Sequence, residues 1–338
     1  MANELLLIPI LISFILAAYT IPKWILKCKQ VGYLWEDVHK IPRTKNVAAS
    51  GGIIIVISFI LGVLSYIAIK TFIMNQDDRT LQIFALLSVI LILALVGFID
   101  DVLGWTYKGL SIKFRLFLAF VASVPLVVIN AGTKIIDIPF IGLINLGILY
   151  PLVLIPIGIA GAATTYNFLA GMNGLEAGQG IIIISFLSFV AYKTSSPGLA
   201  VIGLCMTASL IVFYFYNKYP AKVFPGDVLT YSIGALIAGI AILGDFEKIA
   251  VFVFTPYIIE TILKLRGKLE KQSFVKVNKD KSLDFLYNKI YGLTHLSLFL
   301  LKKFKKKVYE KDVVYLIFTF QIIICLLALI IFRNALSL

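Results

Sequence analysis

Three short segments of the chain carry carboxylates and amides that could bind a metal ion and phosphate groups. In chain order these residues are Asp100, Asp101, Asn167, Asn173, Glu176 and Asp227. Carboxylate and amide oxygens are the ligands that a hard divalent cation prefers. The middle segment is also rich in glycine, and such turns expose backbone N–H groups that can approach a phosphate closely. If the fold brings the segments together, they predict a site for a divalent cation and a polyphosphate.

Each segment also has a purely structural interpretation. Asp227 follows Phe-Pro-Gly and could simply cap a helix, while amides and glycines in membrane spans often serve only helix packing. Asp100 and Asp101 could be solvated loop residues. They fall where a helix should end, which disfavours acidic side chains, and Gly104 and Gly109 predict a tight turn nearby.

Membrane-spanning helices are the elements predicted to position these residues. Of the 338 residues, 60% are hydrophobic and 14% charged, which excludes a soluble multidomain protein. Apolar runs long enough to cross a bilayer predict an all-α polytopic membrane protein with about ten spans. These runs cover residues 4–22, 50–73, 81–99, 114–131, 145–165, 178–192, 198–216, 228–243, 249–264 and 313–332.

The distribution of charge predicts how the spans are oriented. The loops on one side carry 25 of the 31 basic and 12 of the 18 acidic residues, so the whole net charge of +13 lies there. The positive-inside rule makes this side cytoplasmic and places both termini on the other. All three candidate segments then lie at cytoplasmic ends of spans, which favours one shared site. The charge suits lipid headgroups or an anionic substrate, and no motif for nucleic acid is present.

Other kinds of site have little support. Cys28, Cys205 and Cys325 form no CxxC pair, and two histidines are too few for a zinc cluster. We expect His39 and His295 to be solvated or interfacial, because both lie in predicted cytoplasmic segments.

The chain is predicted to be one membrane-embedded domain, residues 1–338, with one long cytoplasmic segment at 265–311. The first half of this segment is basic and polar, which suits a loop over a ligand. The second half has apolar residues at helical spacing from Leu283 to Leu293, followed by the lysine-rich run from Lys302 to Lys307. This pattern predicts an interfacial helix with a polybasic end.

The motifs, in this order, resemble the polyprenyl-phosphate N-acetylhexosamine-1-phosphate transferase superfamily of polytopic membrane enzymes. The resemblance covers about residues 31 to 332. Its most specific parts are Asn145-Leu146-Gly147-Ile148-Leu149-Tyr150, Asn167 to Gln179, Asn217-Lys218-Tyr219-Pro220, Phe224-Pro225-Gly226-Asp227 and Gly244-Asp245-Phe246. The stretch from Gly174 to Gln179 is more similar to the eukaryotic and archaeal UDP-GlcNAc:dolichyl-phosphate GlcNAc-1-phosphate transferases than to the bacterial enzymes acting on UDP-MurNAc-pentapeptide.

The resemblance implies roles for individual residues. Asn167 and Asp227 match magnesium ligands, and Asn173 matches a contact of the uridine nucleotide. Asp100 and Asp101 match paired aspartates near the acceptor phosphate. Of this pair, Asp100 is predicted to activate the lipid phosphate and Asp101 to orient the metal or its waters.

Further substrate contacts are implied around this core. Glu176 belongs to the same nucleotide-binding stretch, and Asp37 and Lys40 lie in the first cytoplasmic loop, which borders the family's site. The family usually has a phosphate-binding lysine in its fourth span. Here either Arg115 or Lys113 could supply that cation.

Two departures from the family pattern concern the binding of the nucleotide-sugar donor. Ala49 stands where the first loop often carries a glutamate that touches the nucleotide. The arginine pair that grips pyrophosphate and sugar has no match, and the available candidates are Arg266, Lys268, Lys271 and Lys276. Lysine lacks the bidentate geometry of arginine, so the identity of the sugar stays open.

The resemblance implies transfer of GlcNAc-1-phosphate from UDP-GlcNAc to dolichyl or another polyprenyl phosphate, with release of UMP and with Mg²⁺ as cofactor. This is the first step of lipid-linked oligosaccharide synthesis. One alternative is the same reaction with another UDP-N-acetylhexosamine. Another is a nucleotide-sugar or anion transporter, which predicts polar groups deep in the spans, whereas the charges here cluster at one interface.

The expected location is an archaeal plasma membrane first and the endoplasmic reticulum second, with the site facing the cytoplasm. The sequence leaves the oligomeric state open, a homodimer included.

Overall fold

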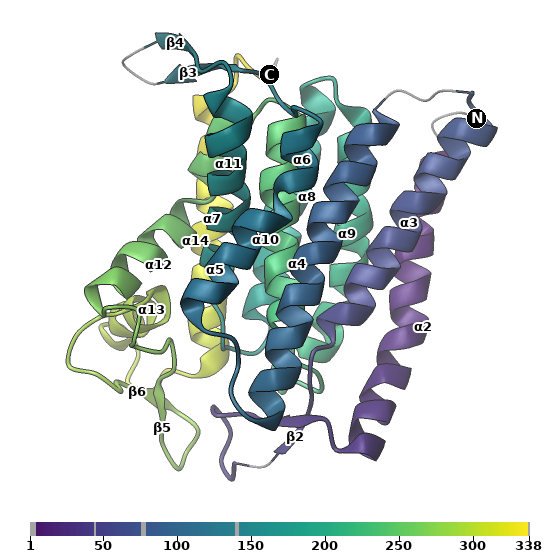
Figure 1. The fold of residues 1–338 in the computed structure, drawn as a ribbon. Coiled ribbons are helices and arrows are strands. Elements are labelled where there is room, and N and C mark those ends of the chain that lie inside the picture. Colours follow the sequence, from purple (N-terminus) through teal and green to yellow (C-terminus); the bar gives the residue numbers. More distant parts are fainter. Residues whose placement is uncertain (1–4, 44, 76–78, 139–141, 337–338) are drawn as a thin grey trace.

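The computed structural model describes residues 5–43, 45–75, 79–138 and 142–336, and these form a bundle of helices (Figure 1). The helices are α2 (Leu7–Val31), α3 (Gly52–Phe72), α4 (Thr80–Thr106), α5 (Ile112–Ala122), α6 (Val124–Val128), the π-helical turn η1 (Tyr150–Leu154), α7 (Ile155–Phe168), α8 (Leu175–Lys193), α9 (Pro197–Asn217), α10 (Asp227–Leu243), α11 (Glu247–Val253), α12 (Thr255–Arg266), α13 (Leu293–Lys302) and α14 (Glu310–Ile331).

Three short antiparallel strand pairs lie outside the helices, in the loops of this bundle. They are β1 (Leu34–Glu36) with β2 (Lys45–Ala48), β3 (Ile135–Ile138) with β4 (Gly142–Asn145), and β5 (Lys276–Val277) with β6 (Leu283–Asp284). The helices therefore carry the architecture, and the predicted all-α polytopic class is confirmed.

Each apolar run predicted to span a membrane coincides with helix. Within the described residues, 7 helices are long and apolar enough to cross a bilayer: α2, α3, α4, η1 with α7, α8, α9 and α14. The other three runs form the shorter helices α5–α6, α10 and α11–α12. Two of these are interrupted near Pro125 and Pro256, because proline has no N–H to donate to the preceding turn. The predicted first run began at residue 4, which lies outside the described residues.

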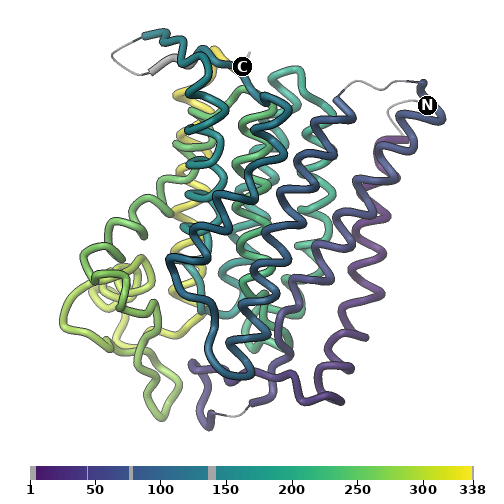
Figure 2. The backbone as a smooth tube through the Cα atoms, viewed as in Figure 1, coloured from purple at the N-terminus to yellow at the C-terminus, as the bar shows by residue number. Residues whose placement is uncertain are grey.

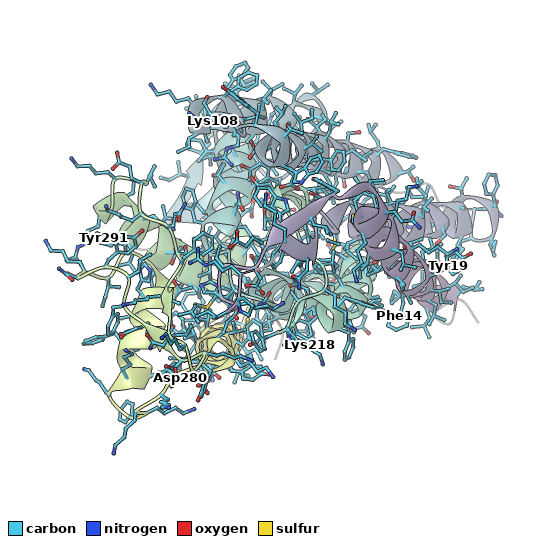
Figure 3. The ribbon with its side chains drawn as sticks, turned by 90° about the horizontal axis from the view of Figure 1, so that it is seen from below. Phe14, Tyr19, Lys108, Lys218, Asp280 and Tyr291 are labelled. Atoms are coloured by element: carbon cyan, nitrogen blue, oxygen red, sulfur yellow. The ribbon has the colours of Figure 1, made fainter. Side chains whose placement is uncertain are left out.

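The bundle has one end rich in basic loops. Strands β2, β5 and β6 lie at the lower end in Figure 1, with α13 beside the bundle just above them, whereas the two marked chain ends and β3–β4 lie at the upper end. The backbone tube in the same view shows this division (Figure 2). Figure 3 looks at the molecule from this end, and Lys108 and Lys218, which follow the ends of α4 and α9, are labelled there. We call this end the basic face. The predicted grouping of the loops on one side, with both termini on the other, is thus the grouping in the fold.

Helix α10 is the centre of the bundle, and α4 packs closely against its beginning. Every residue from Val228 to Leu243 is buried. A Cβ added to Gly97 of α4 would lie 2.5 Å from the backbone carbonyl carbon of Asp227. Glycine at this position lets two candidate segments approach each other.

We expect Gly97→Ala to lower the stability of the protein by about 1–3 kcal/mol, because the methyl group forces α4 and α10 apart. Thermal unfolding of the purified protein in detergent measures this. Gly161→Ala in α7 is the matched control, since nothing lies within 4 Å of its added Cβ. Helix propensity favours alanine at both sites, so equal unfolding temperatures for the two variants would contradict a tight contact at Gly97.

Two predictions about local structure are wrong. Helix α4 does not end before Asp100 but continues to Thr106, so Gly104 is helical, and the predicted turn near Asp100 lies at Gly109, between α4 and α5. The apolar residues from Leu283 to Leu293 do not form a helix. Leu283 pairs with Val277 in β5–β6 and donates its N–H to the Val308 carbonyl at 2.7 Å. The helix of this segment is α13, which begins only at Leu293.

Candidate active site

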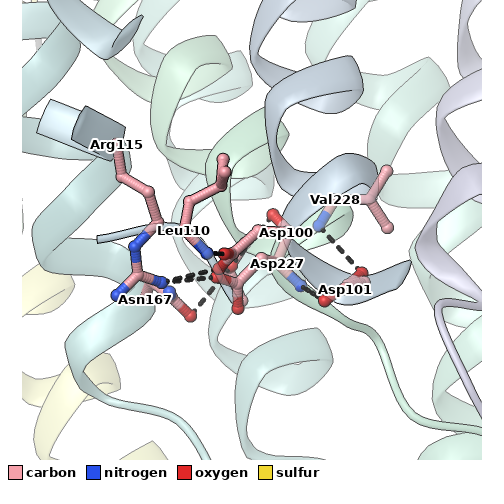
Figure 4. Close-up of polar contacts among 8 residues, drawn as sticks. Asp100, Asp101, Leu110, Arg115, Asn167, Asp227 and Val228 are labelled. Carbon is pink, nitrogen blue, oxygen red and sulfur yellow. Dashed lines mark hydrogen bonds and ion pairs between the residues drawn. The ribbon is translucent and has the colours of Figure 1, made fainter. Parts of the chain in front are cut away.

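Two carboxylates, one from α4 and one from α10, contact the same arginine, and a third carboxylate lies at the start of α10 (Figure 4). Arg115 Nη1 lies 2.8 Å from Asp100 Oδ2 and 3.0 Å from Asp227 Oδ2. The other oxygen of Asp100 accepts the Leu110 N–H, and its side chain is buried. We call Asp100, Asp101, Asp227 and Arg115 the carboxylate cluster. Of the two cations predicted for phosphate binding, Arg115 is at this cluster, while Lys113 is exposed.

Asp101 caps helix α10 from α4. Its Oδ1 accepts the Asp227 N–H at 2.8 Å, and its Oδ2 accepts the Val228 N–H at 3.4 Å. These N–H groups have no partner within α10, and the helix N-terminus attracts negative charge. This explains how an acidic pair is stable in the last turns of α4. Because another helix supplies the cap, the Asp227 side chain is free to face Arg115.

Gly226 makes this capping possible. Its φ of +72° suits glycine, and an added Cβ would lie only 2.1 Å from Asp101 Oδ2. The Phe-Pro-Gly-Asp motif therefore turns the chain so that α10 points its N-terminus at Asp101.

Asn167 is connected to the start of α10 by a hydrogen bond from a threonine. The Asn167 Oδ1 accepts the hydroxyl of Thr230 at 3.1 Å, and Thr230 is one turn after Asp227 in α10. Asn167 is in the last turn of α7, so α7 and α10 bring this amide into contact with α10 one turn after Asp227.

Both groups line a cavity of about 340 Å³. Its walls come from the first loop of the basic face, the turn between α7 and α8, the start of α10 and the long segment after α12. The lining residues include Trp35, Asp37, Asn167, Glu176, Phe224, Asp227 and Phe274. Asp37, Asn167, Glu176 and Asp227 were all predicted as site residues. Asp100 and Asp101 do not line the cavity. They hold Arg115 and the start of α10, respectively.

The glycine-rich turn is shaped by Glu176. Its Oε1 accepts the Gly171 N–H at 2.8 Å, and its carbonyl accepts the Tyr166 hydroxyl at 2.6 Å. Gly171 and Gly174 have φ of +107° and +83°, which favour glycine. Glu176 therefore fixes the turn that forms one wall of the cavity.

Asn173 connects the turn to the first loop and to α14. Its amide group donates to Asp37 Oδ2 at 2.9 Å and to Glu310 Oε2 at 3.3 Å, and its backbone N–H donates to Glu310 Oε1 at 2.6 Å. Lys40 Nζ lies 3.2 Å from Asp37 Oδ2. Asn173 is buried and does not itself line the cavity, so it holds the turn against the first loop and α14.

Both histidines are buried, so the expectation of solvated rings is wrong. His39 is 4% exposed and His295 is 3% exposed. Burial lowers the pKa of His39 to about 4, which makes its ring neutral at pH 7. The loops of the basic face fold back on the bundle and enclose these rings, which their positions in the chain did not indicate.

The basic residues predicted for the long segment do not reach the cavity. Among the described residues that line it, none is lysine or arginine. Arg266 ends α12, Lys268 and Lys276 are exposed, and Lys271 Nζ lies 5.4 Å above the Tyr287 ring. Their assignment to the sugar stays a prediction, with no contact to the cavity in its favour.

Sequence reasoning missed several residues of the site. No motif in the sequence singled out Glu310 at the start of a span or Thr230 within one. Trp35 and Phe274 carried no signal beyond being single aromatics in polar segments. Their roles depend on contacts with distant parts of the chain.

The oxygen groups around Asp227 fit a magnesium ion. Within residues 5–43, 45–75, 79–138 and 142–336, no three His, Cys, Asp or Glu side chains are placed to hold a metal by themselves. Mg²⁺ commonly uses one or two carboxylates and completes its shell with water and substrate phosphate. Asn167 and Asp227 would supply two oxygens to such an ion.

Comparisons with known proteins establish the family. A model described as glycosyl transferase family 4 matches residues 83–245. A protein of Saccharolobus solfataricus named as a UDP-N-acetylglucosamine–dolichyl-phosphate N-acetylglucosaminephosphotransferase is 36% identical over 294 residues, or 86% of this chain and 87% of the relative. This chain belongs to glycosyl transferase family 4.

Two further members carry the same enzyme name. The protein of Sulfolobus acidocaldarius is 30% identical over 96% of this chain and 95% of its own length. That of Dictyostelium discoideum is 30% identical over 64% of this chain and 59% of its own length. These relatives confirm the superfamily and the archaeal and eukaryotic branch that the motifs indicated.

Proposed function

We propose that this protein transfers GlcNAc-1-phosphate from UDP-GlcNAc to dolichyl phosphate or a closely related polyprenyl phosphate, and releases UMP. The observation that carries the proposal is the convergence of Asn167, Asp227 and Arg115 beside one cavity at the basic face. Membership of glycosyl transferase family 4 supports the same reaction. Transfer of a phosphoryl group depends mainly on positioning and on neutralising charge, which this set of groups can provide.

Arg115 is the cation we assign to the phosphates. In the structure its charge is balanced by Asp100 and Asp227. An incoming phosphate would compete for its N–H groups, and the planar guanidinium can bind phosphate oxygens in pairs. Lys113, which is exposed two residues earlier, is not needed for this role.

Asp100 is better placed to hold Arg115 than to act as a base. Both of its oxygens already accept hydrogen bonds, from Leu110 and Arg115. The activation of the lipid phosphate predicted from the sequence would require Asp100 to give up one of them. A lipid phosphate with a second pKa near 6 is already largely a dianion at pH 7 and needs no base.

Mg²⁺, held by Asn167 and Asp227, would neutralise the diphosphate of the donor when bound. Asp101 would not bind the metal itself. It fixes the start of α10, and with it the direction of the Asp227 carboxylate. Glu176, Asn173 and Asp37 shape the turn and loop that enclose the donor.

We also propose that the basic face is cytoplasmic and that the membrane is an archaeal plasma membrane. The positive-inside rule supports the orientation, and the two relatives aligned over most of their length come from Saccharolobus and Sulfolobus. A soluble UDP-sugar and an acceptor confined to the bilayer can meet only at such a surface. The homodimer stays a prediction.

The direct test is incorporation of radiolabelled sugar into lipid by the purified protein. We expect labelled GlcNAc from UDP-GlcNAc to enter solvent-extractable lipid with equimolar UMP release, to stop with EDTA and to resume with excess Mg²⁺. A panel of UDP-N-acetylhexosamines identifies the sugar. Vesicles that accumulate intact UDP-sugar without forming lipid product would favour the transporter and contradict the proposal, and activity unchanged in EDTA would contradict the metal.

A further inference from the structure

Phe274 reaches the cavity from the segment that was predicted to supply cations. It comes from the lysine-rich stretch after α12, which lies to one side of the bundle in Figures 1 and 3. Its ring lies against Gly171, where an added Cβ would be 2.7 Å from the ring edge. It also meets His39 edge to face, with the ring centroids 5.6 Å apart.

The backbone around Phe274 is fixed by buried polar groups. The Thr294 hydroxyl donates to the Ser273 carbonyl at 2.8 Å, and His295 Nε2 lies 3.0 Å from the Phe274 carbonyl. Because His295 Nδ1 accepts the Tyr291 N–H, Nε2 carries the proton and donates. The Ser273 hydroxyl also donates to the Phe168 carbonyl at the end of α7, at 3.2 Å.

Glu260 ties this arrangement to the bundle. It is 0% exposed, its Oε2 accepts the Leu293 N–H, and its Oε1 lies 3.4 Å from the Ser273 hydroxyl. One buried carboxylate therefore caps α13 and holds the residue before Phe274. A segment with so many lysines would otherwise be expected to move freely, yet Phe274 is held in a defined place.

The cavity around Phe274 combines aromatic rings with acceptor groups. Trp35 lies in the same lining, and Glu176 adds a carboxylate, one oxygen of which accepts the Gly171 N–H. Carboxylates only accept hydrogen bonds, which suits hydroxyl groups, and an aromatic ring packs well against the C–H face of a hexose. Since no cation lines the described cavity, a guanidinium clamp on the sugar has no counterpart here.

We propose that Phe274 is a donor-binding residue that packs against the sugar of the UDP-sugar and sets sugar specificity. This inference rests on the proposed function. Glu260, Thr294 and His295 are positioning residues that hold Phe274 at the cavity. Sugar selection in this protein then depends on an aromatic wall with carboxylate acceptors, and the lysines of the segment lie outside it.

The test separates binding of the sugar from binding of the nucleotide. For Phe274→Ala we expect the KM for UDP-GlcNAc to rise about tenfold, the value of one buried aromatic contact, with inhibition by UMP changed less than about twofold. Discrimination between UDP-GlcNAc, UDP-GalNAc and UDP-glucose should weaken. Thr294→Val, which removes only the hydroxyl donor to Ser273, should shift the same KM in the same direction by a smaller factor.

Phe285→Ala is the matched control, because Phe285 belongs to the same segment and is 38% exposed. If Phe274→Ala does not purify as a folded protein, Phe274→Leu is judged by the same criteria. An unchanged KM, or an equal loss of UMP and UDP-GlcNAc binding, would overturn the role in sugar recognition. A wild-type protein that forms no lipid product would instead overturn the proposed function, so the two failures are distinct.

Discussion

Replacing Asp227 with alanine is expected to lower the rate of sugar-phosphate transfer about 1000-fold or more, because the loss of the proposed metal-binding carboxylate removes several kcal/mol of charge stabilisation. Asp227 is the one carboxylate of the cluster that lines the cavity and also contacts Arg115. The variant therefore loses the proposed magnesium ligand and one of the two carboxylates that contact Arg115. The measurement is the initial rate of labelled lipid formation at saturating UDP-GlcNAc and Mg²⁺.

Asp245→Ala is the control for this experiment. Asp245 lies two residues after the last residue of α10, where its carboxylate accepts the Thr133 N–H at 2.9 Å. Both variants remove one aspartate from an end of the same helix, and only Asp227 is at the cavity. Near-normal activity in Asp227→Ala, or an equal loss in both, would refute the assignment of the metal site to this end of α10.

Arg115→Ala is expected to destabilise the protein by about 3 kcal/mol as well as to abolish transfer. Its removal leaves the carboxylates of Asp100 and Asp227 without a counter-ion in a buried cluster, and uncompensated buried charge costs about 3–5 kcal/mol. The lower end applies because the Arg115 side chain is 24% exposed. Thermal unfolding in detergent gives the stability, and the lipid-labelling assay gives the activity.

A second substitution distinguishes charge from packing. In Arg115→Ala with Asp100→Asn, one of the two uncompensated charges is gone, so part of the lost stability should return while transfer stays absent. Lys113→Ala removes the same charge from an exposed position of the same helix and should leave both properties close to wild type. If the double variant is no more stable than Arg115→Ala, the electrostatic explanation of the cluster is incorrect.

Much of the architecture could be read from the sequence. For most of the apolar runs, from 50–73 to 313–332, the ends of the observed helix lie within a few residues of the predicted ends. The reason is that the thickness of the bilayer sets the length of a span. The basic loops identified one face of the bundle without any structure. Asn167 and Asp227 were predicted by their residue types and motif contexts, and both line the cavity.

Local patterns failed where the partner of a group comes from far along the chain. Asp101 looked unfavourable near a helix end until α10 provided N–H groups for it. The start of α13 was misplaced because its cap is Glu260, a residue of α12. The lysines of the long segment suggested that cations from it would contact the donor, whereas the residue of this segment that lines the cavity is Phe274.

The sequence by itself therefore determined which segments enter the membrane, which side carries the charge and which residue types could bind a metal and a diphosphate. These properties depend on hydrophobicity and charge, which each segment carries alone. Only the tertiary structure decided which of those residues share a cavity and which hold it in place. Hydrogen bonds and close packing act over a few ångströms, so they depend on residues such as Asp101 and Asp227 that are adjacent in space and distant in the chain.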